Sequence, residues 1–174
     1  MLKRLKSDER GVAAVEFAII APVAILLYCG FAEVTMALMA ERRADHAASV
    51  VGDLVAQTQS VSASDVTDIF TVGQAIMKPF PSAALKLRLT SVTADAQGVP
   101  RVTWSQGNGL TPFTNGAAVA GFPATLLAVG DSVIEADVQY AYTSPLGMTV
   151  PSPLTFRESF YLKPRQSTAV VNTG

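Results

Sequence analysis

The chain has 174 residues, a length that fits one membrane anchor and one domain of about a hundred residues. It is 49% hydrophobic with a mean hydropathy of +0.34, values that are high for a soluble protein and low for one with several membrane spans. The net charge is −1 and no basic patch with interleaved aromatic residues occurs, which argues against nucleic acid as a partner. The single cysteine, Cys29, excludes an intramolecular disulfide.

A long apolar segment follows the N-terminus. Sixteen residues from Phe17 to Ala32 carry no charge, and the four residues before Glu16 extend the segment to about twenty, enough to cross the hydrocarbon core of a bilayer. Backbone groups in lipid must bond within the segment, so we expect a transmembrane helix over residues 12–33. Pro22 lies in its middle and is expected to bend or loosen the helix there.

The charge around this segment predicts its orientation. Residues 1–10 contain four basic and two acidic side chains, a net charge of +2, which leaves −3 on the remainder. Positive charge before a span favours a cytoplasmic N-terminus and an exported body. Arg42 and Arg43 follow the span and weaken this argument.

One carboxylate, Glu16, interrupts the start of the apolar segment at the fifth position counted from Val12. An ionisable group in a membrane segment costs about 3 kcal/mol on insertion scales, so it indicates a partner or a role. Two plainer interpretations stay open. One is an uncleaved anchor with Glu16 at the headgroup level, and the other is a secretory signal peptide cleaved after residues 30–32, for which the apolar core is too long.

The helix is expected to continue beyond the membrane over residues 34–60. Small and apolar residues recur there at spacings of three and four, and such a stripe lets another backbone approach closely. The stripe either packs on the protein's own sheet or contacts another helix, and both contacts can occur at different positions along the helix. Its members are Ala37, Ala40, Ala44, Ala47, Val51 and Leu54.

Residues 61–165 are expected to form an α+β domain with an antiparallel sheet of about four strands. A short helix begins after Ser62, which with Asp65 resembles a capping box, and Pro79 ends it. Alternating apolar and polar residues, or turn residues beside them, then predict the strands. These strands are expected near residues 85–95, 101–105, 134–142 and 156–162, with Glu158 awkwardly placed on the apolar face of the last one.

The connections are expected to be exposed. Residues 107–130 are rich in glycine and predict a long surface loop, with a short helix at 124–128. The strand face that carries Glu135 and Asp137, with Asp131 before it, offers oxygen ligands that calcium accepts, but a solvated sheet face is the favoured interpretation. The tail, residues 166–174, is expected to be flexible.

Little in the sequence points to catalysis. His46, the only histidine, lies on a polar helix face with no nucleophile nearby in the sequence. Zinc would need several His or Cys ligands, and no glycine-rich phosphate loop opens a helix. We therefore expect no enzymatic activity, no cofactor and no metal site.

The N-terminal junction resembles that of a known family. Glycine followed by an apolar helix with glutamate at its fifth position is similar to the class III signal of type IV prepilins. The run Arg10-Gly11-Val12-Ala13-Ala14-Val15-Glu16-Phe17-Ala18, followed by Ile19, Ile20 and Pro22, resembles the TadE-like pseudopilins of the tight-adherence (Tad/Flp) pilus system. Lys163-Pro164-Arg165 looks like the closing motif of that family, and the short chain favours TadE over the larger TadG-like proteins.

This resemblance implies cleavage of a leader, residues 1–11, between Gly11 and Val12 by a membrane prepilin peptidase. It implies a minor pilin or pseudopilin that acts in assembly of Flp-type IVb pili for surface adhesion. The partners would be the peptidase, the major Flp pilin, other minor pilins, the inner-membrane platform and membrane lipid. The body would lie in the periplasm of a bacterium, anchored by a single pass in the inner membrane. Entry into the extracellular pilus, capping of it and help in assembly all stay open.

Three residues are expected at subunit contacts: Glu16, Phe17 and Pro22. The amine that cleavage creates on Val12 can pair with Glu16 of a neighbouring subunit, since each charge is costly alone in lipid. Pro22 would weaken the helix where subunits leave the bilayer.

Two other classes stay open, an uncleaved membrane-anchored periplasmic binding module with the 107–130 loop as its ligand surface, and a secreted domain.

Overall fold

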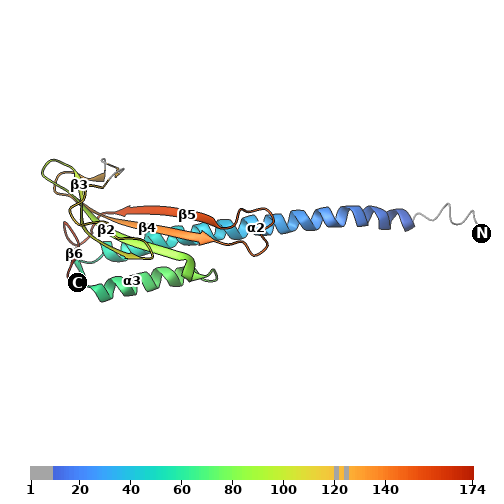
Figure 1. Cartoon of the computed structure of the whole chain (residues 1–174), viewed down its shortest axis with the longest axis horizontal. Coiled ribbons are helices and arrows are strands. Elements are labelled where there is room, and N and C mark those ends of the chain that lie inside the picture. The colour runs from blue at the N-terminus through green and yellow to red at the C-terminus, as the bar shows by residue number, and fades with distance from the viewer. Residues whose placement is uncertain (1–9, 120–121, 124–125) are drawn as a thin grey trace, which may run out of the picture.

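A single helix, α2 (Arg10–Ala56, 47 residues), forms the long axis of the molecule (Figure 1). The computed structural model describes residues 10–119, 122–123 and 126–174. The first half of α2 projects from the rest of the chain, and its second half packs beside the sheet (Figure 1). The helix runs through Pro22 without interruption, although proline lacks the amide hydrogen for one helical bond. Pro22 therefore does not end the predicted helix.

The second helix, α3 (Ala63–Ile76), begins with the predicted capping box. The amide of Asp65 donates to the Ser62 hydroxyl at 3.2 Å, and the amide of Ser62 donates to the Asp65 carboxylate at 2.8 Å. Two amides at the start of the helix are thereby satisfied. The buried face of α3 contains Val66, Phe70 and Gly73, as its apolar periodicity predicts.

Four antiparallel strands form the main sheet, which confirms the predicted α+β class. A 3₁₀ turn, η1 (Ser82–Ala84), leads into β2 (Leu85–Ala94), and β3 (Pro100–Asn108) returns beside it. The spatial order is β3-β2-β4-β5, with β4 (Ser132–Tyr142) and β5 (Leu154–Leu162) completing the sheet.

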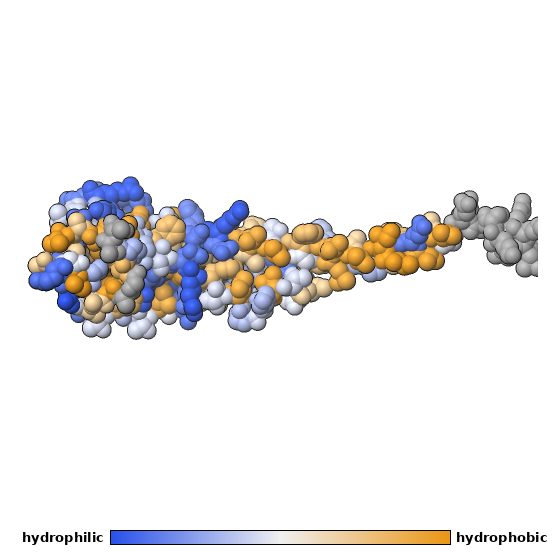
Figure 2. All heavy atoms as spheres, turned by 90° about the horizontal axis from the view of Figure 1, so that it is seen from above, coloured by the Kyte–Doolittle hydropathy of each residue, from blue (hydrophilic) through white to orange (hydrophobic). Residues whose placement is uncertain are grey.

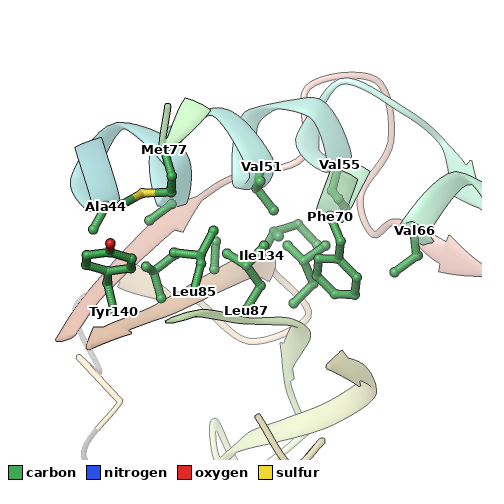
Figure 3. Close-up of a cluster of buried hydrophobic side chains, with 14 of the residues drawn as sticks. Ala44, Val51, Val55, Val66, Phe70, Met77, Leu85, Leu87, Ile134 and Tyr140 are labelled. Atoms are coloured by element: carbon green, nitrogen blue, oxygen red, sulfur yellow. The ribbon is translucent and has the colours of Figure 1, made fainter. Parts of the chain in front are cut away.

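Both helices cover one face of this sheet, and the hydrophobic core lies between the helices and the sheet (Figure 3). Leu85 pairs with Tyr140 and Leu87 with Val138, so the alternating apolar residues of β2 and β4 point to the same side. The alanine stripe of α2 packs on this core, and it continues to Val55 instead of the predicted Leu54. Small side chains on α2 let the helix approach the sheet closely.

The opposite face of the sheet is buried where we expected it to be solvated. Glu135 is 6% exposed and Asp137 is 8% exposed. Arg88 of β2 forms an ion pair with Asp137 at 2.7 Å, and the Ser159 hydroxyl donates to the same carboxylate at 2.6 Å. The aromatic ring of Phe113 lies 3.5 Å from the Arg88 guanidinium carbon. The prediction was wrong because alternation shows which residues share a face but not what covers that face.

The cover is part of the predicted surface loop. Phe122 is buried against Val92 and Val133, and its ring meets that of Tyr161 edge-on at 5.2 Å. The segment after β3 therefore folds back over the sheet instead of standing free. The predicted short helix at 124–128 falls partly on residues 124–125, outside the described residues.

The C-terminal tail also differs from the flexible extension that we expected. Residues of β6 (Val171–Asn172) pair in parallel with β1 (Ser60–Val61), and Val170 is fully buried. The buried side chain and the backbone pairing give the tail the contacts that it needs to stay in place.

Glu158 occupies the awkward position that the sequence indicates. It lies half-buried between Phe156 and Phe160 on the face of β5 that meets α2. Burial, and next the charges of Asp45 and Glu41, raise the pKa of Glu158.

Candidate membrane and assembly surface

The five residues that the sequence singles out all lie on the projecting half of α2 (Figure 1). A Cβ added at Gly11 would meet no atom within 4 Å. Val12 is 59% exposed and Phe17 is 72% exposed, and Glu16 and Pro22 are exposed as well. These residues are close to one another only because they follow each other along α2. The sheet contacts the opposite end of this helix.

The face of the projecting half of α2 that is seen in Figure 2 is mostly hydrophobic, with one hydrophilic interruption near its outer end. Large apolar side chains from Val12 to Phe31 are more than half exposed, including Ile19, Ile25 and Tyr28. Among the described residues, one helix is long and apolar enough to cross a membrane, and it is this one. Such a surface is unfavourable in water and suits lipid, which supports a single-pass membrane anchor.

Glu16 interrupts this apolar surface one helical turn after Val12. Residues four apart lie on the same side of a helix, so the two face the same surroundings. Glu16 is exposed, so its carboxylate is directed at whatever surrounds the projecting helix. A carboxylate in such surroundings is stabilised by a cation from another molecule or by the headgroup layer.

A second carboxylate of α2, Glu33, is buried and hydrogen-bonded, a feature that the sequence analysis missed. Its side chain is fully buried beneath the loop between β4 and β5. The backbone amides of Met148, Thr149 and Val150 donate to it at 3.1, 2.6 and 3.4 Å. The Thr149 hydroxyl donates at 2.5 Å, and the Ser144 hydroxyl donates to the other carboxylate oxygen.

The sequence shows that Glu33 needs hydrogen-bond partners but does not show which residues supply them. A lone acid within an apolar stretch that resumes with Val34 demands hydrogen-bond donors. Those donors lie 111–117 residues later in the chain, so no local pattern identifies them. Together they fasten the β4–β5 loop to the helix at the end of the domain nearest the projecting segment (Figure 1).

His46 is exposed on α2. In residues 10–119, 122–123 and 126–174, no group of three or more His, Cys, Asp or Glu side chains is placed to hold a metal ion.

A comparison with known protein families gives a match in the region of this helix. Residues 11–52 match the family model TadE, described as TadE-like protein. The match begins at the junction glycine and ends at Gly52, where α2 crosses the sheet. No curated protein and no solved structure matches the chain. This match agrees with the resemblance seen in the sequence and is consistent with a TadE-like protein of the Tad pilus system.

Proposed function

We propose that this protein is a minor pilin or pseudopilin of the tight-adherence system, matured by a prepilin peptidase and active in assembly of Flp-type pili. The TadE match that starts at Gly11 is the observation that supports this proposal most directly. The exposed apolar helix that follows the glycine agrees with it, because a pilin needs a helix that can leave lipid and pack with other helices.

Processing between Gly11 and Val12 fits the local structure. The junction lies at the start of α2 with open space around Gly11, so a membrane peptidase can reach the backbone. Glycine also weakens a helix by about 1 kcal/mol relative to alanine, which eases the local unwinding that peptide cleavage requires.

Assembly then depends on the pair formed by the new Val12 amine and Glu16 of a neighbouring subunit. Both charges are costly in lipid, and pairing them sets the axial register of adjacent helices. Phe17 adds apolar contact area beside the pair. Pro22 supplies a weaker helical turn where a subunit leaves the bilayer. The partners are the major Flp pilin, other minor pilins and the inner-membrane platform, and the role is structural with no catalysis by this chain.

Processing is tested by intact mass and N-terminal sequencing of the protein from its own cells, with and without the prepilin peptidase. We expect a mature chain that starts at Val12 only when the peptidase is present. Gly11→Leu should block cleavage, because its side chain crowds the scissile bond. Ala24→Leu adds a large side chain at another exposed position of α2 and should be processed normally. A chain that keeps its first eleven residues in peptidase-positive cells would instead favour the uncleaved anchor.

A further inference from the structure

The apolar surface of α2 does not stop at Glu33. Val34, Leu38 and Met39 are 44–49% exposed beyond it. The next charged side chains along the described helix are Glu41 and the exposed Arg42. The lipid-compatible stretch therefore runs from Val12 to Met39, 28 residues, and not only to residue 33.

This stretch is longer than the hydrocarbon core. At 1.5 Å per residue it measures about 42 Å, against about 30 Å for the core. At the average tilt of about 20°, about 21 residues cross the core. A span that begins at Val12 then ends near Ala32, and Glu33 to Met39 enter the interfacial layer of headgroups. A span that begins after Glu16 places Glu33 within the hydrocarbon itself.

The burial of Glu33 lowers the free-energy cost of its carboxylate in either placement. An exposed carboxylate at this depth would have to be hydrated or protonated. The five donors from Ser144, Met148, Thr149 and Val150 replace water around both of its oxygens. The loop thus removes from lipid the charge that divides the apolar surface beyond Glu16 into two parts.

The loop that covers Glu33 is uncharged and exposes two large apolar side chains. Residues 143–153 contain no charged side chain. Leu146 is 47% exposed and Met148 is 53% exposed. Two grooves of about 340 and 310 Å³ lie between the helix and this loop, and both are lined by Val34 and Thr149. The lining of the first is largely apolar, whereas the second also includes Glu41. The apolar surface of the span is therefore continuous with that of the loop.

We propose that the β4–β5 loop, residues 143–153, is a second membrane contact that rests in the interfacial layer of the phospholipid bilayer beside α2. Leu146 and Met148 enter the boundary between headgroups and acyl chains, and acyl chains fill the groove of about 340 Å³ that Val23, Leu27 and Thr149 line. This contact sets the depth and the rotation of the domain at the membrane surface. It depends on the membrane anchor and not on processing or pilus assembly.

The test uses the full chain in vesicles of phosphatidylethanolamine and phosphatidylglycerol. Cys29→Ser removes the only native thiol, and Met148→Cys then accepts an environment-sensitive fluorophore. We expect blue-shifted emission and strong quenching by phospholipids that carry a nitroxide near the headgroup end of the acyl chain. Val129→Cys, exposed near the β2–β3 turn at the far end of the sheet, is the matched control and should show neither effect.

Leu146→Cys repeats the measurement at a second position and replaces the first variant if that one misfolds. The substitution at Met148 keeps the backbone amide that binds Glu33, so the loop stays fastened. Probes at 146 and 148 that behave like the probe at 129 would overturn the proposal. Quenching by a spin-labelled second copy of the chain, with none by labelled lipid, would also overturn it and assign the surface to a protein contact.

Discussion

The indole nitrogen of Trp104 donates a 2.8 Å hydrogen bond to the backbone carbonyl of Val170, 66 residues later in the chain. Both residues are buried, and Trp104 belongs to β3, one of the two edge strands of the four-stranded sheet. The contact joins the C-terminal tail to the end of the domain farthest from the membrane anchor. The tail thus acts as part of the fold.

Deletion of residues 170–174 should expose Trp104 and lower the free energy of unfolding by about 3 kcal/mol. The estimate combines the burial of one valine side chain with one hydrogen bond. Because Trp104 is the only tryptophan, a red shift of its fluorescence reports the change directly. Deletion of Gly174 alone is the control and should leave the emission unchanged. An unshifted spectrum after the longer deletion would show that the tail does not cover Trp104 in solution.

Glu33→Gln should loosen the β4–β5 loop without unfolding the sheet. The glutamine amide presents hydrogens to at least one group that also donates, so part of the donor set around Glu33 loses its acceptor. Hydrogen exchange at the amides of Thr149 and Val150 should become faster, while exchange in β2 stays slow. Glu41→Gln, a partly exposed acid two turns further along α2, serves as the matched control. Equal protection of the loop amides in both variants would contradict the role of Glu33.

Stability should depend on pH through Glu135. Burial, and next the charge of Asp137, raise the pKa of Glu135 above its ordinary value of 4.5. The folded state then binds more protons than the unfolded state, so the free energy of unfolding falls as the pH rises from 4.5 through the raised pKa. Burial and Glu135 raise the pKa of the adjacent Tyr161 to about 12, so Tyr161 stays neutral in this range.

Glu135→Gln removes this titration and keeps the shape of the side chain. Urea unfolding in detergent, followed by Trp104 fluorescence, should show less pH dependence for the variant as the pH rises above 4.5. The variant should also be more stable than the natural chain at the higher pH. Asp137→Asn is the contrasting change, because it leaves the partly buried Arg88 without its ion-pair partner and should destabilise the protein. A pH profile unchanged by Glu135→Gln would exclude Glu135 as its source.

Glu16→Ala should insert into the membrane normally and assemble poorly, if the pilin proposal holds. Removal of the carboxylate makes the helix easier to place in lipid and leaves the Val12 amine of a neighbour unpaired. The readouts are the membrane-bound amount of the protein and the yield of pili sheared from cells. Glu16→Asp keeps the charge and should retain more assembly than the alanine variant. Normal piliation with Glu16→Ala would remove the proposed role of Glu16.

The elements that the sequence predicts well are those specified by nearby residues. The capping box of Ser62 and Asp65, the alternation of leucines in β2 and the apolar run of α2 each act within a few positions of the chain. The junction around Gly11 is also a local motif, which is why the resemblance to TadE-like proteins is visible in the sequence alone.

By itself, the sequence determined an apolar helix, a capped second helix, an antiparallel sheet and a TadE-like junction, since periodicity and caps act over one or two turns. Tertiary structure alone decided the surroundings of Glu33, Asp137 and Trp104, whose partners lie 22–117 residues away. It also decided that a loop covers the outer sheet face and that a second loop shields the acid of the membrane-side helix. Burial of a charge depends on what the folded chain brings over it, and that is a property of the whole arrangement.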